Sequence, residues 1–168
     1  MNHWNDGDGA NDAGGFSSLR VMLVGDDEPF LQRVAGLFVN VGHRSRLVAD
    51  PRAALAAVGE ADVDVLVCDL GATRLQSIAT ILALRALGDE APPVVVISSM
   101  PNLAQHCEAL HVEHFIAQPF RFSGLLEIVE RVGEDWRANP IERSGVFFRQ
   151  QVEGLIESLP DLEALSFG

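Results

Sequence analysis

The chain has 168 residues, 48% hydrophobic and 21% charged, which is enough apolar sequence to bury the core of one domain. Its 24 acidic residues outnumber 12 basic ones, all Arg, giving a formal charge of -12 that argues against nucleic acid or an anionic membrane as main partner. The absence of Lys excludes Schiff-base chemistry and a P-loop lysine. No apolar run is long enough to span a membrane. Cys68 and Cys107 are too few for a disulfide scaffold, so we expect a cytoplasmic protein.

Residues 1–18 are rich in Gly, Asn and Asp and predict a flexible leader, without the basic start or apolar stretch of a signal peptide. From Leu19 onward, short apolar runs alternate with helical patterns. The strands are expected at 19–24, 44–48, 63–68, 93–97 and 114–117, and the helices at 30–41, 51–58, 75–87, 101–110 and 122–136. Strands that are apolar on both faces and alternate with helices predict an α/β domain over 19–136 with a doubly wound five-stranded parallel sheet.

Polar residues follow four of these strands. They are Asp26 and Asp27 after the first, Asp69 after the third, Ser98 after the fourth and Gln118 after the fifth. Ligands of such sheets bind beyond the carboxyl ends of the strands. Converging carboxylates suit Mg²⁺, and a carboxylate beside Mg²⁺ can act as a nucleophile that forms an acyl phosphate. Taken singly, the acidic pair is an ordinary helix cap before Pro29 and Asp69 an ordinary turn residue; only the joint pattern favours a site.

The stretch from Leu19 to Val132 resembles the receiver domain of two-component response regulators. The motifs that carry the resemblance are DDEP at 26–29, VDVLVCD ending at Asp69, PVVVIS ending at Ser98, Phe115 in the last strand, and QPF at 118–120. The resemblance implies a flavodoxin-like fold and a cis peptide bond between Gln118 and Pro119.

The resemblance also implies roles for single residues. Asp69 would accept a phosphoryl group from a histidine kinase or a phosphotransfer protein. Asp27 and Asp69 would ligate Mg²⁺ directly, Asp26 would act through water, and Gly71 would add its carbonyl oxygen. Ser98 would hydrogen-bond the phosphoryl group.

The remaining implied role, rotation in response to phosphorylation, falls on Phe115. Gln118 departs from the family, which has Lys there; a neutral amide donates a hydrogen bond but compensates no charge.

Two hypotheses stay open. One is an atypical single-domain regulator that signals through protein contacts, and the other a phosphorylation-independent pseudo-receiver acting as an interaction or dimerisation module. We expect no enzyme, since Gly71 stands where a phosphatase of the haloacid dehalogenase group needs a second Asp.

Residues 137–168 are too few for the usual DNA-binding output domain. Phe148, Val152, Leu155, Ile156 and Leu159 fall on one face of a predicted amphipathic helix. This C-terminal helical extension either folds back over the domain or docks on a downstream protein or a second copy of the chain.

Overall fold

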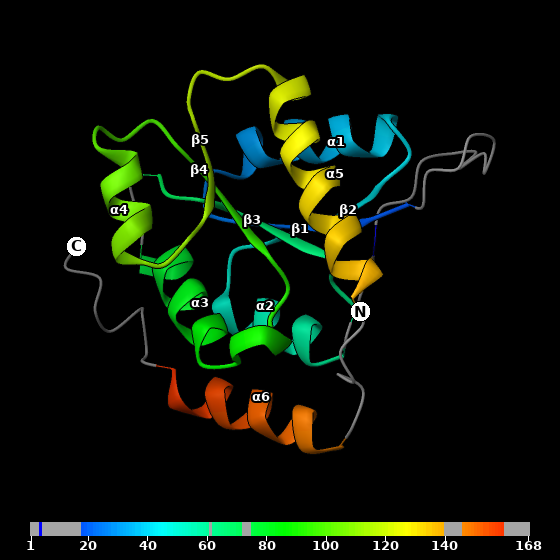
Figure 1. Cartoon of the computed structure of the whole chain (residues 1–168), viewed down its shortest axis with the longest axis vertical. Helices are drawn as coiled ribbons and strands as arrows, with labels where there is room; N and C mark the ends of the chain where they lie inside the picture. The colour runs from blue at the N-terminus through cyan, green and yellow to red at the C-terminus, as the bar shows by residue number, and fades with distance from the viewer. Residues whose placement is uncertain (1–3, 5–17, 61, 72–74, 140–145, 160–168) are drawn as a thin grey trace.

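The computed structural model describes residues 4, 18–60, 62–71, 75–139 and 146–159. Its strands are β1 (Arg20–Val24), β2 (Arg44–Val48), β3 (Val65–Asp69), β4 (Val94–Ser98) and β5 (His114–Ala117). Its helices are α1 (Glu28–Asn40), α2 (Pro51–Gly59), α3 (Leu75–Arg85), the 3₁₀ helix η1 (Gly88–Glu90), α4 (Leu103–Ala109), α5 (Phe122–Ala138) and α6 (Val146–Ser158). All strand pairs are parallel, in the order β2-β1-β3-β4-β5 (Figure 1). The predicted α/β sheet is confirmed.

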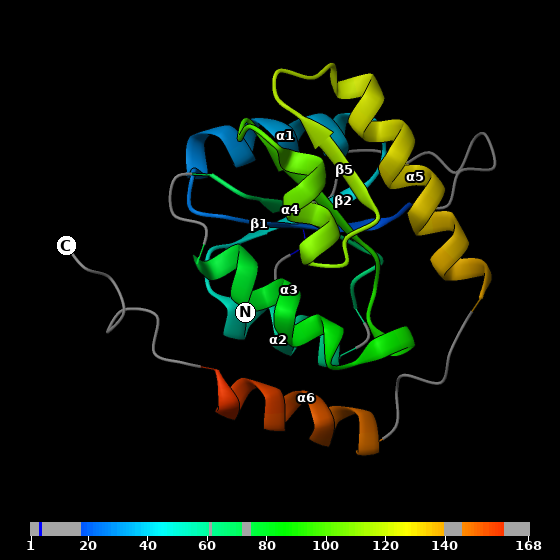
Figure 2. The same ribbon diagram turned by 60° about the vertical axis from the view of Figure 1, so that its left-hand side comes forward.

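The two faces of the sheet bury separate cores, because successive side chains of a strand point to opposite faces. Val21 and Leu23 of β1 pack with α1 and α5, whereas Met22 and Val24 pack with α2, α3 and α4. Figure 2 shows these two helical layers on either side of the sheet. Both layers leave the carboxyl ends of β1, β3 and β4 at one edge.

Several predicted boundaries are wrong by one or two residues. Helix α4 begins at Leu103 instead of residue 101, because Asn102 adopts a left-handed conformation with φ of 59°. Helix α3 ends at Arg85 and is followed by η1, whose first residue, Gly88, has a φ of +59°. Strand β3 begins at Val65 instead of residue 63, and α5 continues to Ala138, beyond the expected end of this helix at residue 136.

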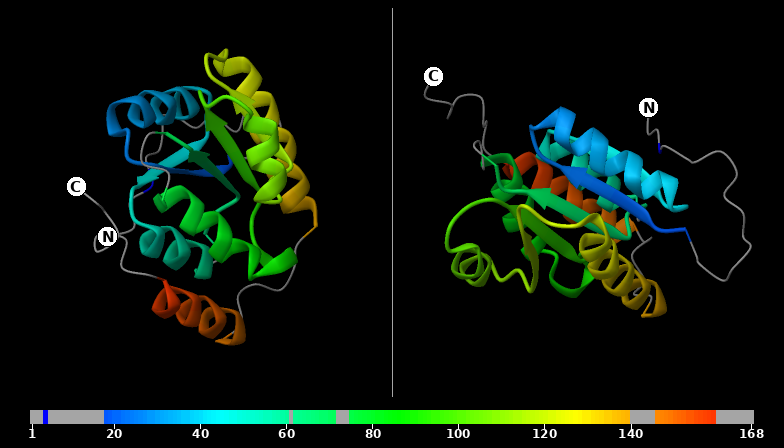
Figure 3. Two further views of the ribbon diagram at one scale, coloured as in Figure 1. Left: turned by 90° about the vertical axis from the view of Figure 1, so that its left-hand side faces the viewer. Right: turned by 90° about the horizontal axis from the view of Figure 1, so that it is seen from above.

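Helix α6 packs on the outer side of α2, as Figures 1 and 3 show from different directions. Phe148 and Val152 are buried against the core on the α2 side of the sheet, with relative exposures of 3% and 2%. The Arg52 guanidinium donates to the Leu159 carbonyl at 3.5 Å, and Val152 lies against Gly59, so the two helices are antiparallel. Of the two alternatives for this helix, the structure has the intramolecular one.

A network of charged groups joins the amino-terminal edge of the sheet to the end of α5. The buried Asp64 carboxylate accepts hydrogen bonds from the Arg20 backbone N–H at 2.8 Å and from Arg137 Nη2 at 2.7 Å. Arg20 also donates to Asp62, which accepts from the Trp4 indole N–H at 2.8 Å. Trp4 is thus packed on the domain, whereas the rest of the predicted leader, apart from residue 18, lies outside the described residues.

Candidate functional site

Asp69 is the last residue of β3 and lies at the sheet edge where the strands end. Its side chain is only 6% exposed. Gly25, directly after β1, makes room for it, since a Cβ atom at position 25 would lie 3.1 Å from Cβ of Asp69 and 2.9 Å from Cδ1 of Leu31. The close approach of the β1 end to Asp69 therefore requires glycine.

The environment of Asp69 disfavours its negative charge. Burial raises the pKa of Asp69 to about 6, and the nearby carboxylates of Asp27 and Asp26 contribute to the rise. Both of those residues are exposed to solvent. Since the charges of Asp26 and Asp27 affect the pKa of Asp69, the three carboxylates lie close enough to interact, as the sequence predicts. A pKa raised in this way indicates that nearby cationic groups of the protein do not balance the negative charge of Asp69.

Asp27 is also the helix cap that the simpler interpretation proposed. Its Oδ1 accepts the backbone N–H of Phe30 at 3.2 Å at the start of α1. Capping fixes the carboxylate at the end of β1. The two interpretations of the acidic pair are therefore compatible, since one oxygen caps the helix and the other is left for a ligand.

The residues present fit a divalent cation of the magnesium type. Within the described ranges, no group of three or more His, Cys, Asp or Glu side chains forms a metal site. The predicted arrangement needs only two direct carboxylate ligands, Asp27 and Asp69, and a carbonyl oxygen. Gly71 lies beside the Asp69 carboxylate, because a Cβ atom at position 71 would lie 3.6 Å from Asp69 Oδ2. A hard cation stabilises the ionised form of a buried carboxylate that has other carboxylates nearby, as Asp69 has.

Ser98, at the end of β4, is fully buried. Its hydroxyl donates to the Leu70 carbonyl at 2.8 Å and accepts the Met100 backbone N–H at 3.0 Å. It therefore ties the segment after β3 to the segment after β4. To hydrogen-bond a phosphoryl group, as the resemblance implies, this hydroxyl has to give up its bond to Leu70.

Gln118 and Pro119 are joined by a cis peptide bond, as expected. The Gln118 backbone N–H donates to the Ser98 carbonyl at 2.8 Å, which places Gln118 beside the end of β4. Among the described residues, its side-chain amide has no hydrogen-bond partner. Phe115 lies on β5 with 37% of its surface exposed, so it faces outward instead of filling the core.

Sequence reasoning missed Ser77 on α3. This buried residue donates its hydroxyl to the Asp69 carbonyl oxygen at 2.9 Å and so fixes the end of β3 against α3. A small hydroxyl residue in the first turn of the helix that follows Asp69 is the only signal in the sequence for this contact.

Comparisons with known proteins agree with the fold. The response regulator receiver domain family matches residues 21–130. The Regulator of RpoS from Escherichia coli K12 is 27% identical over 138 residues, covering 71% of this chain and 41% of that protein, so the chain spans less than half of this relative's length.

Two solved structures share the fold. The receiver domain of the Francisella response regulator 1452 is 22% identical, with a TM-score of 0.61 over 73% of this chain and 100% of that one. The receiver domain of the sensor histidine kinase PA1611 from Pseudomonas aeruginosa, described with a magnesium ion in its active site cleft, is 18% identical, with a TM-score of 0.57 over 70% and 99% of the two chains. The chain therefore belongs to the response regulator receiver domain family of two-component signalling proteins.

Proposed function

We propose that this receiver domain accepts a phosphoryl group on Asp69 and transmits its state through protein contacts. An Oδ atom of Asp69 attacks the phosphorus of a phosphohistidine, a P–O bond forms, the P–N bond breaks, and its electron pair stays on the donor imidazole nitrogen. The observation that carries the proposal is the buried Asp69 carboxylate, with its pKa raised to about 6 beside Asp27 and Asp26. At neutral pH most of it is ionised and able to act as a nucleophile.

Mg²⁺ is the proposed cofactor, held by Asp27, Asp69 and the Gly71 carbonyl, with Asp26 acting through water. When bound, it supplies positive charge that offsets the carboxylates and the incoming phosphoryl oxygens. The magnesium ion named for the PA1611 receiver supports this assignment.

The proposed phosphoryl donor is a histidine kinase or a phosphotransfer protein, and the proposed location is the cytoplasm. A hollow of about 620 Å³ beside Gln118 is lined by the aromatic side chains of Phe30, Phe120 and Phe122 and by Leu37, which is 41% exposed. Apolar surface beside Ser99 and Gln118, which directly follow β4 and β5, suits a protein donor. In the described part of the chain no helix is long and apolar enough to cross a membrane. We propose no nucleic-acid partner, because the chain carries a charge of -12.

The second candidate is a pseudo-receiver that works without phosphorylation, as an interaction or dimerisation module. Gln118 in place of Lys favours it, as does Ser98, whose hydroxyl is already engaged with Leu70. Under either hypothesis we propose no enzymatic activity, because Gly71 has no side chain to serve as the acid or base of a phosphatase.

An amide NMR titration with Mg²⁺, followed by beryllofluoride, separates the candidates. A phosphoaccepting domain responds around Asp69 to both additions, and the Asp69→Asn variant loses the response to beryllofluoride. Shifts that reach Ser98 and Phe115 indicate a working switch. A folded protein that responds to neither addition is a pseudo-receiver, and the phosphoryl proposal is then wrong.

A further inference from the structure

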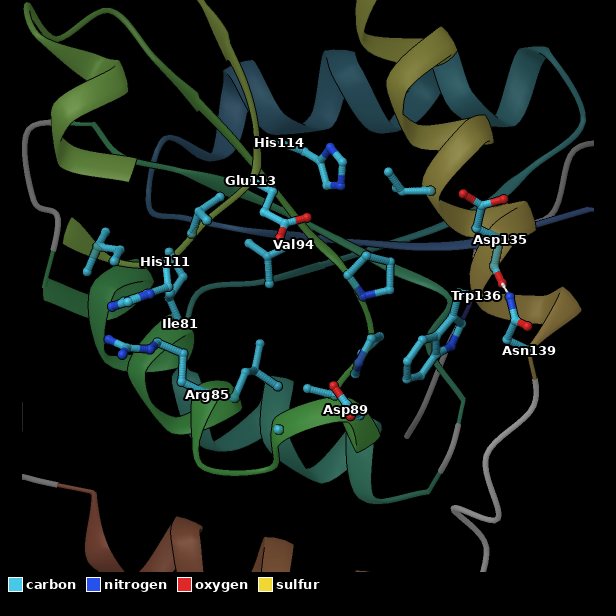
Figure 4. A pocket seen from close by; sticks show the side chains of 18 of the residues that line it. Ile81, Arg85, Asp89, Val94, His111, Glu113, His114, Asp135, Trp136 and Asn139 are labelled. Carbon is cyan, nitrogen blue, oxygen red and sulfur yellow. Dashed lines mark hydrogen bonds between the residues drawn. The ribbon is translucent and has the colours of Figure 1, made fainter. Parts of the chain in front are cut away.

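A second hollow, of about 810 Å³, opens at the edge of the sheet opposite to the Asp69 edge. It lies between the end of α3, η1, the start of β5 and the end of α5 (Figure 4). Its size falls in the range of about 300–1,000 Å³ that small-molecule sites occupy. None of the residues assigned above to phosphoryl or metal chemistry lines it.

The floor of this hollow is apolar. Ile81 and Leu84 of α3 and Val132 of α5 are buried core residues, and Val94 begins β4. Above these buried residues, Ala91, Pro93 and Val94 also line the hollow and are only half-buried, so a ligand that rests on them buries apolar surface.

The rim carries charged side chains of both signs. Figure 4 shows Arg85 and His111 on one side of the hollow, with Asp89 and Trp136 on the other. Within the described ranges, the side chains of Arg85, His111 and Asp89 have no hydrogen-bond or ion-pair partner. Their charged or polar ends are therefore available to a ligand.

His111 occupies a backbone position that glycine adopts at lower cost. It follows the last turn of α4 with a φ of 56°, and its N–H donates to the Glu108 carbonyl at 3.1 Å. Glycine is the usual residue there, because a left-handed conformation crowds a Cβ atom. The imidazole is thus held at the rim against a local backbone preference.

We propose that this hollow binds a small molecule with an apolar body, a carboxylate at one end and a cationic group at the other. The carboxylate is recognised by Arg85 and His111. The cation lies between Asp89 and the face of the Trp136 indole, which attracts positive charge. Ligands with several negative charges, such as nucleotides, are disfavoured because the carboxylates of Asp89, Glu113 and Asp135 outnumber the guanidinium groups of Arg85 and Arg131 around the hollow.

The probe is 8-aminooctanoate, compared with octanoate and octylamine, which each keep only one of the two charged ends. We expect the Trp136 indole N–H and the Val94 amide to shift in NMR spectra on titration, with at least fivefold weaker binding of either single-ended compound. Arg85→Gln should weaken 8-aminooctanoate at least fivefold. Arg33→Gln, which removes an exposed guanidinium from α1, is the matched control and should not.

His111→Gly separates binding from folding, since it relieves the backbone position and removes the imidazole. It should raise the melting temperature and weaken binding of the probe. Absence of shifts at Trp136, or equal binding of all three compounds with no effect of Arg85→Gln, overturns the proposal. Asp69→Asn should bind the probe as the unmodified chain does, so the result is independent of the phosphoryl chemistry.

Discussion

Val152 of α6 packs directly against the backbone of Gly59 at the end of α2. A Cβ atom at position 59 would lie 2.9 Å from Cγ1 and 3.2 Å from Cβ of Val152. Val is branched at Cβ and has little freedom to move away from such a contact. The packing of α6 on α2 therefore depends on the absence of a side chain at Gly59.

Two glycine substitutions test this packing of α6 on α2. Gly59→Ala should lower the free energy of unfolding by about 1–3 kcal/mol, because it forces α6 away from α2. Gly154→Ala, on the same helix pair but with nothing within 4 Å of the added Cβ, should raise it by about 0.5–1 kcal/mol through helix propensity. Urea unfolding measures both, and Val152→Ala should rescue part of the loss in Gly59→Ala. Equal stabilisation by the two substitutions would show that α6 is not seated on Gly59.

Asp69→Asn should stabilise the metal-free protein at neutral pH. The pKa of Asp69 in the folded chain, about 6, exceeds the ordinary 3.8, so the folded state binds the proton more tightly than the unfolded state. The stability that Asp69 contributes is thus greatest in acid and is lost as the pH rises toward and through 6. Since the two pKa values correspond to about 3 kcal/mol at most, we expect a gain of about 1–3 kcal/mol for Asp69→Asn at pH 7.5.

Thermal unfolding in a chelator at pH 7.5 and pH 4 measures this effect. The advantage of Asp69→Asn should be present at pH 7.5 and nearly absent at pH 4, where the native carboxyl is protonated. Added Mg²⁺ should stabilise the unmodified chain more than the variant. A variant less stable than the unmodified chain at both pH values would refute the electrostatic explanation.

Asp64→Asn should destabilise the domain. Burial alone would raise the pKa of Asp64, but hydrogen bonds from Arg137 and Arg20 outweigh it and hold the pKa below its ordinary value. Removing the charge leaves two guanidinium groups without their shared partner, for a loss of about 2–4 kcal/mol. Asp62→Asn, whose carboxylate is 32% exposed, should cost less than about 1 kcal/mol.

The dependence of the unfolding free energy on pH in acid gives an independent test of the Asp64 and Asp62 variants. The contribution of Asp64 is complete above the ordinary pKa of 3.8 and is lost as the pH falls through the lower native value. Chemical unfolding between pH 2 and pH 5 should therefore show a flatter slope for Asp64→Asn than for Asp62→Asn. Parallel slopes would argue against a depressed pKa at Asp64.

Gln118→Lys should restore the charge that the family places beside the phosphoacceptor. An ammonium next to Asp69 lowers the pKa of that carboxyl, so the metal-free variant should be more stable than the unmodified chain at pH 7.5. Gln118→Met, which is neutral, unbranched and about as long as Gln, is the control. Beryllofluoride-dependent NMR shifts at Phe115 should be larger in Gln118→Lys. If both variants behave alike, the family's lysine position has no electrostatic role in this domain.

Much of the fold and the outline of the site followed from short stretches of sequence. The first, third and fourth strands are short apolar runs with polar residues at their carboxyl ends, which predicted that Asp27, Asp69 and Ser98 lie at one edge of a parallel sheet. The pairing of Asp64 with Arg137 was not predictable, because the two are 73 residues apart. The contact between Gly59 and Val152 is likewise set by tertiary packing. Local patterns fix periodicity and helix caps, but not which distant side chains meet.

The ion pair between Arg137 and Asp64 gives α5 two unequal ends. Its last turn is held to the start of β1 and β3, whereas its first residue follows Arg121, which makes no side-chain capping bond. A displacement that begins near Gln118 therefore moves the amino-terminal turns of α5 most, and the motion decreases toward Arg137. We expect such a helix to change its angle to the sheet instead of sliding along it. A protein that binds this side of the domain would then bind α5 at a different tilt in the two states.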